Sequence, residues 1–166
     1  MRSAVGYALA GLLLAAAGTV SAQTPRLTTA TYDDWTERCE MLNGVKTCEI
    51  EQTSQVQGQP FSQVAIGRPS KGEPLRIVVQ VPINVWLPTG VSLTADDKDQ
   101  AIVAAFKRCV GGGCYADVDL SDETIKKLRA RTEKGKLLFK DAAQRDVTVP
   151  ISFKGFAPAF DAMAKE

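Results

Sequence analysis

The fold is decided at residues 39–48, which read Cys39-Glu40-Met41-Leu42-Asn43-Gly44-Val45-Lys46-Thr47-Cys48. An Asn-Gly pair favours a two-residue hairpin turn, because both turn positions need positive φ. The strands entering and leaving that turn, residues 32–39 and 45–52, would bring the two cysteines together. This stretch therefore predicts an antiparallel hairpin closed by a disulfide.

A second cysteine pair encloses the sequence Val110-Gly111-Gly112-Gly113 between Cys109 and Cys114. Glycines leave the chain free to fold back tightly, so residues 101–106 and 115–120 are expected to form a second hairpin. Four cysteines allow three pairings, and we favour Cys39–Cys48 with Cys109–Cys114. Loops this short should each add about 2 to 3 kcal/mol of stability.

The rest of the chain predicts more strands. Leu75, Ile77, Val79 and Val81 alternate with polar residues, as in a strand that covers a core. Further strands are expected at residues 61–67, 91–95, 136–140 and 147–153. Pro150 suggests that the last of them lies at a sheet edge. The predicted fold is an all-β, antiparallel sandwich or barrel-like domain of about eight to ten strands.

Two short helices are expected among these strands. Ser121, followed by two acids, is a helix start, with an apolar stripe of Ile125 and Leu128 that Gly135 would stop. Pro158 would start a final helical turn carrying Phe160 and Met163.

The N-terminal end has the order of a secretory signal peptide. Arg2 precedes the apolar run of residues 8–17, and small residues lead to Ala22. Cleavage after Ala22 would leave a flexible leader at 23–31 and a single domain at 32–166. No later segment is long and apolar enough to span a bilayer. The expected location is the periplasm, or a secreted or outer-membrane-associated position.

Composition argues against several classes of function. The formal charge is +1, which lacks the basic excess of a nucleic-acid-binding protein. Histidine is absent from the sequence, so nucleophile–histidine catalysis cannot be built. The cysteine spacings fit neither a zinc site nor a redox motif. We expect no enzyme activity, no cofactor and no metal site.

Two tryptophans are the candidate interaction residues, Trp35 and Trp86. The leading hypothesis is a non-catalytic protein-interaction module with an exposed apolar or aromatic patch on one sheet face. One alternative is a periplasmic small-ligand binder whose cavity Trp86 and nearby prolines would line. The other is a hydrolase with acids facing one cleft. Its candidate acids are Asp33, Asp34, Asp96, Asp97, Asp117 and Asp119.

The order of these features resembles the invasion-associated locus B family of exported bacterial proteins. The resemblance is carried by Asp34-Trp35, Cys39 and Cys48, residues 88–93, 106–109, 113–116 and 151–156, and Ala159-Phe160. It implies a Gram-negative envelope or secreted protein without a known catalytic set. It also implies an unidentified protein partner in the envelope or on a host cell. Host-cell association or invasion is one role it suggests, and general envelope maintenance is another.

Overall fold

The computed structural model describes residues 26–42, 44–96 and 100–166. Four expectations fall wholly or partly outside this range: the signal peptide, residues 23–25 of the leader, the Asn43 half of the Asn-Gly turn, and Asp97.

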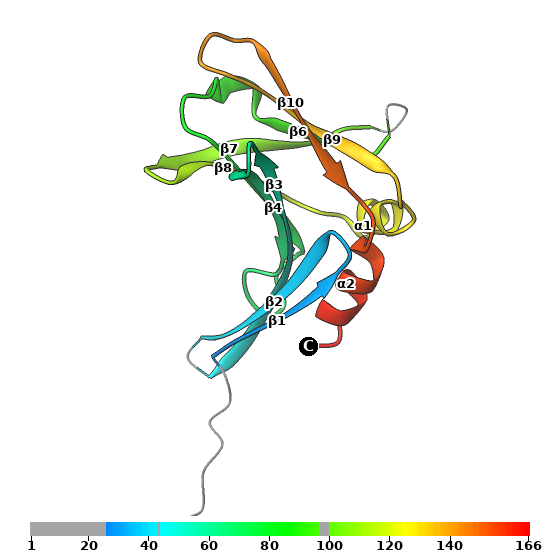
Figure 1. Ribbon diagram of the computed structural model, residues 1–166. Helices are drawn as coiled ribbons and strands as arrows, with labels where there is room; N and C mark the ends of the chain where they lie inside the picture. Colours follow the sequence, from blue (N-terminus) through cyan, green and yellow to red (C-terminus); the bar gives the residue numbers. More distant parts are fainter. Residues whose placement is uncertain (1–25, 43, 97–99) are drawn as a thin grey trace, which may run out of the picture.

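All strand pairs in the described chain are antiparallel, and together they form one ten-stranded sheet with the order β1-β2-β3-β4-β5-β8-β7-β6-β9-β10. Figure 1 shows β1 and β2 at one end of the molecule and β9 and β10 at the other. The sheet folds over so that β10 contacts β3, which gives a sandwich-like arrangement. This confirms the predicted all-β class. The strands are β1 Leu27–Tyr32, β2 Trp35–Leu42, β3 Val45–Val56, β4 Gln59–Gly67, β5 Arg76–Val81, β6 Val91–Thr94, β7 Ile102–Val110, β8 Gly113–Asp119, β9 Lys134–Lys140 and β10 Asp146–Ser152.

Both predicted hairpins are present. Strands β2 and β3 pair in a register that sets Cys39 opposite Cys48, and Gly44 has φ of +81° at the connection. Strands β7 and β8 pair so that Cys109 faces Cys114, with Gly111 and Gly112 at the turn. In each hairpin the register alone brings the cysteines together.

The expected leader at residues 23–31 is wrong for its described C-terminal part. Residues 27–32 form strand β1, which pairs with β2 from Leu27 opposite Glu40 to Tyr32 opposite Trp35. Its threonines are β-branched and suit a strand. Because β1 is largely exposed, it lacks the apolar alternation by which the other strands were predicted.

The two helices are confirmed, with corrected ends. Helix α1, Asp122–Arg129, begins at Ser121, whose hydroxyl accepts a hydrogen bond from the Thr124 amide. It ends well before Gly135, which lies in β9, where a Cβ would stand 2.3 Å from the Thr94 carbonyl oxygen. Close strand approach, and not helix termination, therefore requires this glycine. Helix α2, Phe156–Met163, begins two residues before Pro158.

The core lies between the inner faces of the folded sheet and beneath the two helices. Helix α2 packs on β1, β2 and β3, and it contacts α1. Trp35 is fully buried there, edge-on to Phe156 at 5.0 Å between ring centroids. Strand β10, which carries Pro150, lies at an edge of the sheet as predicted.

Polar contacts join the first hairpin to the last strand. The Gln52 amide nitrogen donates to the carbonyl oxygens of Asp34 and Ser152, at 3.1 and 3.0 Å. The Ser152 amide donates back to Gln52 Oε1 at 2.8 Å. These bonds satisfy a buried glutamine and fix β10 against β3.

No helix in the described part of the chain is both long and apolar enough to cross a membrane.

Candidate interaction site

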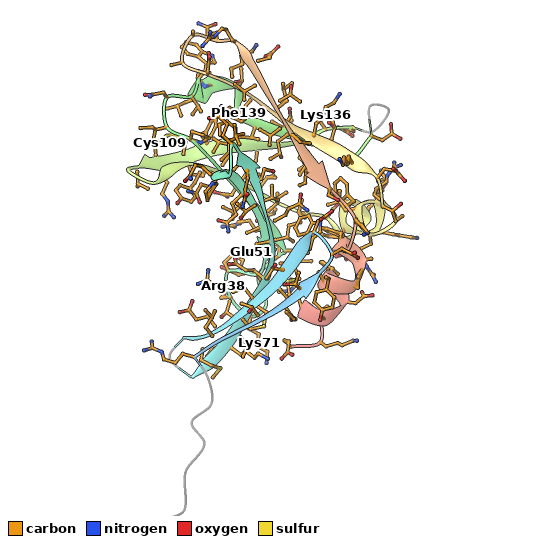
Figure 2. The ribbon with its side chains drawn as sticks, viewed as in Figure 1. Arg38, Glu51, Lys71, Cys109, Lys136 and Phe139 are labelled. Atoms are coloured by element: carbon orange, nitrogen blue, oxygen red, sulfur yellow. A yellow bond between two sulfur atoms is a disulfide. The ribbon has the colours of Figure 1, made fainter. Side chains whose placement is uncertain are left out.

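The four cysteines form the two predicted disulfides, Cys39–Cys48 and Cys109–Cys114. Each joins residues directly opposite on adjacent strands, and Figure 2 shows Cys109 near the end of the β7–β8 hairpin. Glu37, Cys39 and Cys48 place their possible ligand atoms within 4.8 Å of one another. Since both sulfurs are joined in the disulfide, this group has no thiolate to offer a metal.

Trp35 is not a surface residue, which corrects its assignment as a candidate interaction residue. Its exposed fraction is 0%, and its indole nitrogen donates to the Ser152 carbonyl oxygen at 2.8 Å. The burial arises because Trp35 faces the same side of β2 as the buried Glu37 and Cys39. Its role is to fill the core and hold β10.

Trp86, in contrast, lies at the surface with an exposed fraction of 36%. Its amide donates to the Lys140 carbonyl oxygen at 2.8 Å, and Val85 bridges Asp141, so the segment before β6 follows the end of β9. Pro82 lines a hollow of about 500 Å³, but Trp86 does not. The other lining residues include Phe61, Gln63, Gln80 and the glycine loop. The expected tryptophan-lined cavity is therefore not formed there.

Exposed apolar side chains lie on the elements around Trp86. Leu87 belongs to a single 3-10 turn, Leu87–Thr89, that contacts β7 and β9. Ser92 in β6 pairs with both Val103 in β7 and Leu138 in β9, so these two side chains share one sheet face. Leu87, Val103 and Leu138 have exposed fractions of 52%, 56% and 38%. We call Trp86, Leu87, Val103 and Leu138 the apolar surface.

A second feature, the outer groove, has a volume of about 450 Å³ and crosses the solvent face of β2, β3, β4, β5, β8 and β7. Its middle is lined by Ala65 and Gly67 of β4 and Val78 of β5. The groove forms because these central side chains are small, while larger side chains border them on both sides. They include Arg38 and Glu49 on one side, and Arg76, Arg108 and Tyr115 on the other. Figure 2 shows Arg38 on the side of the sheet away from helix α2.

The charges in the outer groove are unevenly neutralised. Arg76 donates to Asp119 at 2.8 Å and lies 3.9 Å from Asp117, and the bond to Asp119 raises the pKa of the guanidinium. Burial raises the pKa of Glu49, and the nearby Glu51 adds to that increase. Glu49 and Glu51 therefore repel each other when both carboxyls are ionised.

The aspartates proposed for a hydrolase are spread over the molecule. Asp33 pairs with Lys154, Asp96 with Arg131, and both Asp117 and Asp119 with Arg76. Asp34 is exposed, and Asp97 lies outside the described residues. The outer groove was not predicted from the sequence, because its lining residues come from six strands that only the folded sheet brings together.

The fold and these surfaces define a class: a small antiparallel β domain held by two hairpin disulfides, with an apolar surface and a charged groove. Residues 35–164 match the family model of the invasion associated locus B (IalB) protein, so the chain belongs to that family. This confirms the resemblance seen in the sequence.

Individual proteins agree with this assignment. An invasion protein B homolog of Brucella abortus strain 2308 is 28% identical over 133 residues, covering 79% of this chain and 76% of that protein. The homolog of Brucella abortus biovar 1 strain 9-941 matches to the same extent. The crystal structure of invasion associated protein B from Bartonella henselae superposes with a TM-score of 0.73 at 20% identity, covering 83% of this chain and 95% of that one. This last likeness supports the fold.

Proposed function

We propose that this chain is an exported cell-envelope protein that acts by binding another protein, without catalysis. The single observation that carries the proposal is the apolar surface, since four large apolar side chains on adjoining elements stay exposed at a cost in water. Protein interfaces are enriched in aromatic residues, and Trp86 supplies one here.

The arrangement of acids supports a non-catalytic role. Glu51, Ala65, Val78 and Asp117 lie in one row across four strands. Three strand spacings separate the backbones of Glu51 and Asp117 by roughly 14 Å. Paired carboxylates in glycosidases are about 5 to 9.5 Å apart. The backbones of Glu51 and Asp117 are farther apart than such a pair, which supports the non-catalytic proposal for these two acids.

The names of the relatives support the biological part of the proposal. The relatives from Brucella and Bartonella carry invasion in their names. For this chain we propose a partner either in the envelope or on a host cell, reached after removal of residues 1–22. The signal sequence supports this location.

Site-specific photocrosslinking in cells that make the protein tests this proposal. A photoreactive amino acid replaces Leu87 in the apolar surface and, as the matched control, Lys126 on the exposed side of α1. We expect a discrete adduct from position 87 that is absent from position 126. Adding Val103→Asp and Leu138→Asp should remove the adduct without changing the amount of protein. Equal crosslinking from both positions, or none from position 87, would show that the apolar surface is not the binding site.

A further inference from the structure

We propose that the outer groove is a binding site for an anionic oligosaccharide. Five cationic and three acidic side chains line the groove, so cations are in excess. This inference stands on different residues from the apolar surface and does not depend on the proposed protein partner.

The cations concentrate at a β-bulge in β7. Ala105 pairs with Asp117 and Phe106 with Ala116, but the register then shifts, so that Arg108 and not Lys107 faces Tyr115. Regular alternation would send Lys107 and Arg108 to opposite faces. The bulge instead lets both side chains line the groove. Bulges commonly re-aim side chains in this way beside functional sites.

These two cations are available to a ligand. Within the described residues neither Lys107 nor Arg108 forms an ion pair, whereas Arg76 is held by Asp119 and Arg38 lies 3.9 Å from Glu40. The Arg108 guanidinium stacks over the Tyr115 ring at 5.1 Å from its centroid. Stacking uses the face of the guanidinium and leaves its N–H donors in the plane free for a carboxylate, sulfate or phosphate.

The rest of the lining favours a saccharide over a protein surface. Charged residues are depleted from the cores of protein interfaces, but here they surround a narrow floor of Ala65, Gly67 and Val78. Acceptors such as Asp117 and Glu40 suit sugar hydroxyls, while Lys107 and Arg108 suit acidic substituents. The volume of about 450 Å³ is in the range of small-ligand sites.

Gly67 keeps this floor open. A Cβ at Gly67 would lie 2.9 Å from the Glu49 Cβ, so any side chain there would press on the groove wall. The groove therefore depends on the glycine that pairs with Glu49 in the register of β3 and β4.

Isothermal titration calorimetry, in which hexagalacturonate is titrated into the disulfide-bonded protein, tests the proposal. We expect saturable binding that weakens with salt. Lys107→Gln with Arg108→Gln should weaken it by at least about tenfold, the scale of one lost charge-assisted contact. The matched control, Lys126→Gln with Lys127→Gln on α1, removes the same charge and should change affinity less than about twofold. Thermal melts establish that both variants are folded.

Two further probes distinguish the kind of ligand. Neutral maltohexaose should not bind at millimolar concentration, and hexaglutamate should bind more weakly than hexagalacturonate. Equal binding of hexaglutamate would overturn the saccharide assignment and point to an acidic peptide. Equal loss in both double variants, or no hexagalacturonate binding at millimolar concentration, would overturn the site itself.

Discussion

The Trp35 indole nitrogen donates a hydrogen bond to the Ser152 carbonyl oxygen across 117 residues of sequence. Ser152 ends β10, and Trp35 begins β2, so this bond joins the last strand to the second one. Gln52 reinforces the join by bonding both the amide and the carbonyl of Ser152. The domain is closed by polar contacts inside an apolar core.

Trp35→Phe should destabilise the protein by about 2 to 3 kcal/mol, because it removes a buried donor and leaves space beside Phe156. The same replacement at the exposed Trp86 should change stability by less than about 0.5 kcal/mol. Urea unfolding monitored by circular dichroism measures both. A larger loss at Trp86 than at Trp35 would contradict the core assignment.

Each disulfide should contribute about 2 to 3 kcal/mol on the chain-entropy model, since the cysteines are separated by 9 and 5 residues. Cys109→Ser should therefore lower the free energy of unfolding by that amount and release one titratable thiol. Peptide mapping should find that thiol at Cys114, and at Cys48 in Cys39→Ser. A free Cys48 in Cys109→Ser would mean that the pairing is wrong.

Gly155→Ala should destabilise the fold by about 3 kcal/mol or more, since φ at Gly155 is +84° and a Cβ would lie 1.9 Å from the Tyr32 carbonyl oxygen. Gly112→Ala is the matched control, because a Cβ there meets nothing within 4 Å. Its effect should stay below about 1 kcal/mol. Thermal unfolding compares the pair, and similar losses would show that α2 is not seated against β1 at Tyr32.

Glu49→Gln should raise stability at neutral pH. Burial raises the pKa of Glu49 in the folded state, so between the ordinary value of 4.5 and the raised one the folded protein binds more protons than the unfolded chain. Stability then falls as pH rises through that window. We expect a gain of less than about 1 kcal/mol at pH 7, because Glu49 is only partly buried. Urea unfolding from pH 4 to 7 should show a flatter profile for the variant.

Glu123 serves as the control, because its pKa is lowered in the folded protein and its effect on stability therefore has the opposite dependence on pH. Its pKa is lowered by the hydrogen bond from Lys127, so its contribution is present above the unfolded pKa and is lost as pH falls. Glu123→Gln should therefore not raise stability at pH 7. A loss of stability in Glu49→Gln would contradict burial as the dominant effect.

The exported form should begin at Gln23. Intact-mass measurement of the protein released from cells by osmotic shock should show the loss of residues 1–22. Replacing Ala22 with a bulky Trp should block cleavage and leave the longer form bound to membranes. Full-length protein in the soluble cytoplasmic fraction would contradict export.

Local sequence patterns predicted the two hairpins, their disulfides and the alternating strand at Leu75 to Val81, because each depends on residues near one another in the chain. The edge strand β1 was missed, since Thr28, Thr29 and Thr31 show no apolar alternation. Its one available signal was β-branching.

Long-range features could not be predicted from the sequence. The burial of Trp35 depends on Phe156 and Ser152, which are far away in sequence. The outer groove depends on the bulge at Lys107, and alternation would have placed Lys107 and Arg108 on opposite faces. Contacts between side chains that depend only on sheet register cannot be predicted from a short stretch of sequence.

The join between Trp35 and Ser152 also bears on when the domain can fold. A chain leaving a membrane channel from its N-terminus exposes the β2–β3 hairpin early, but Ser152 emerges only near the end. Contacts of such high sequence separation form slowly, because loop closure must precede them. The complete domain cannot assemble before nearly all of the chain has emerged. For the export proposed above, this late closure would leave the polypeptide unfolded until most of it has crossed the membrane.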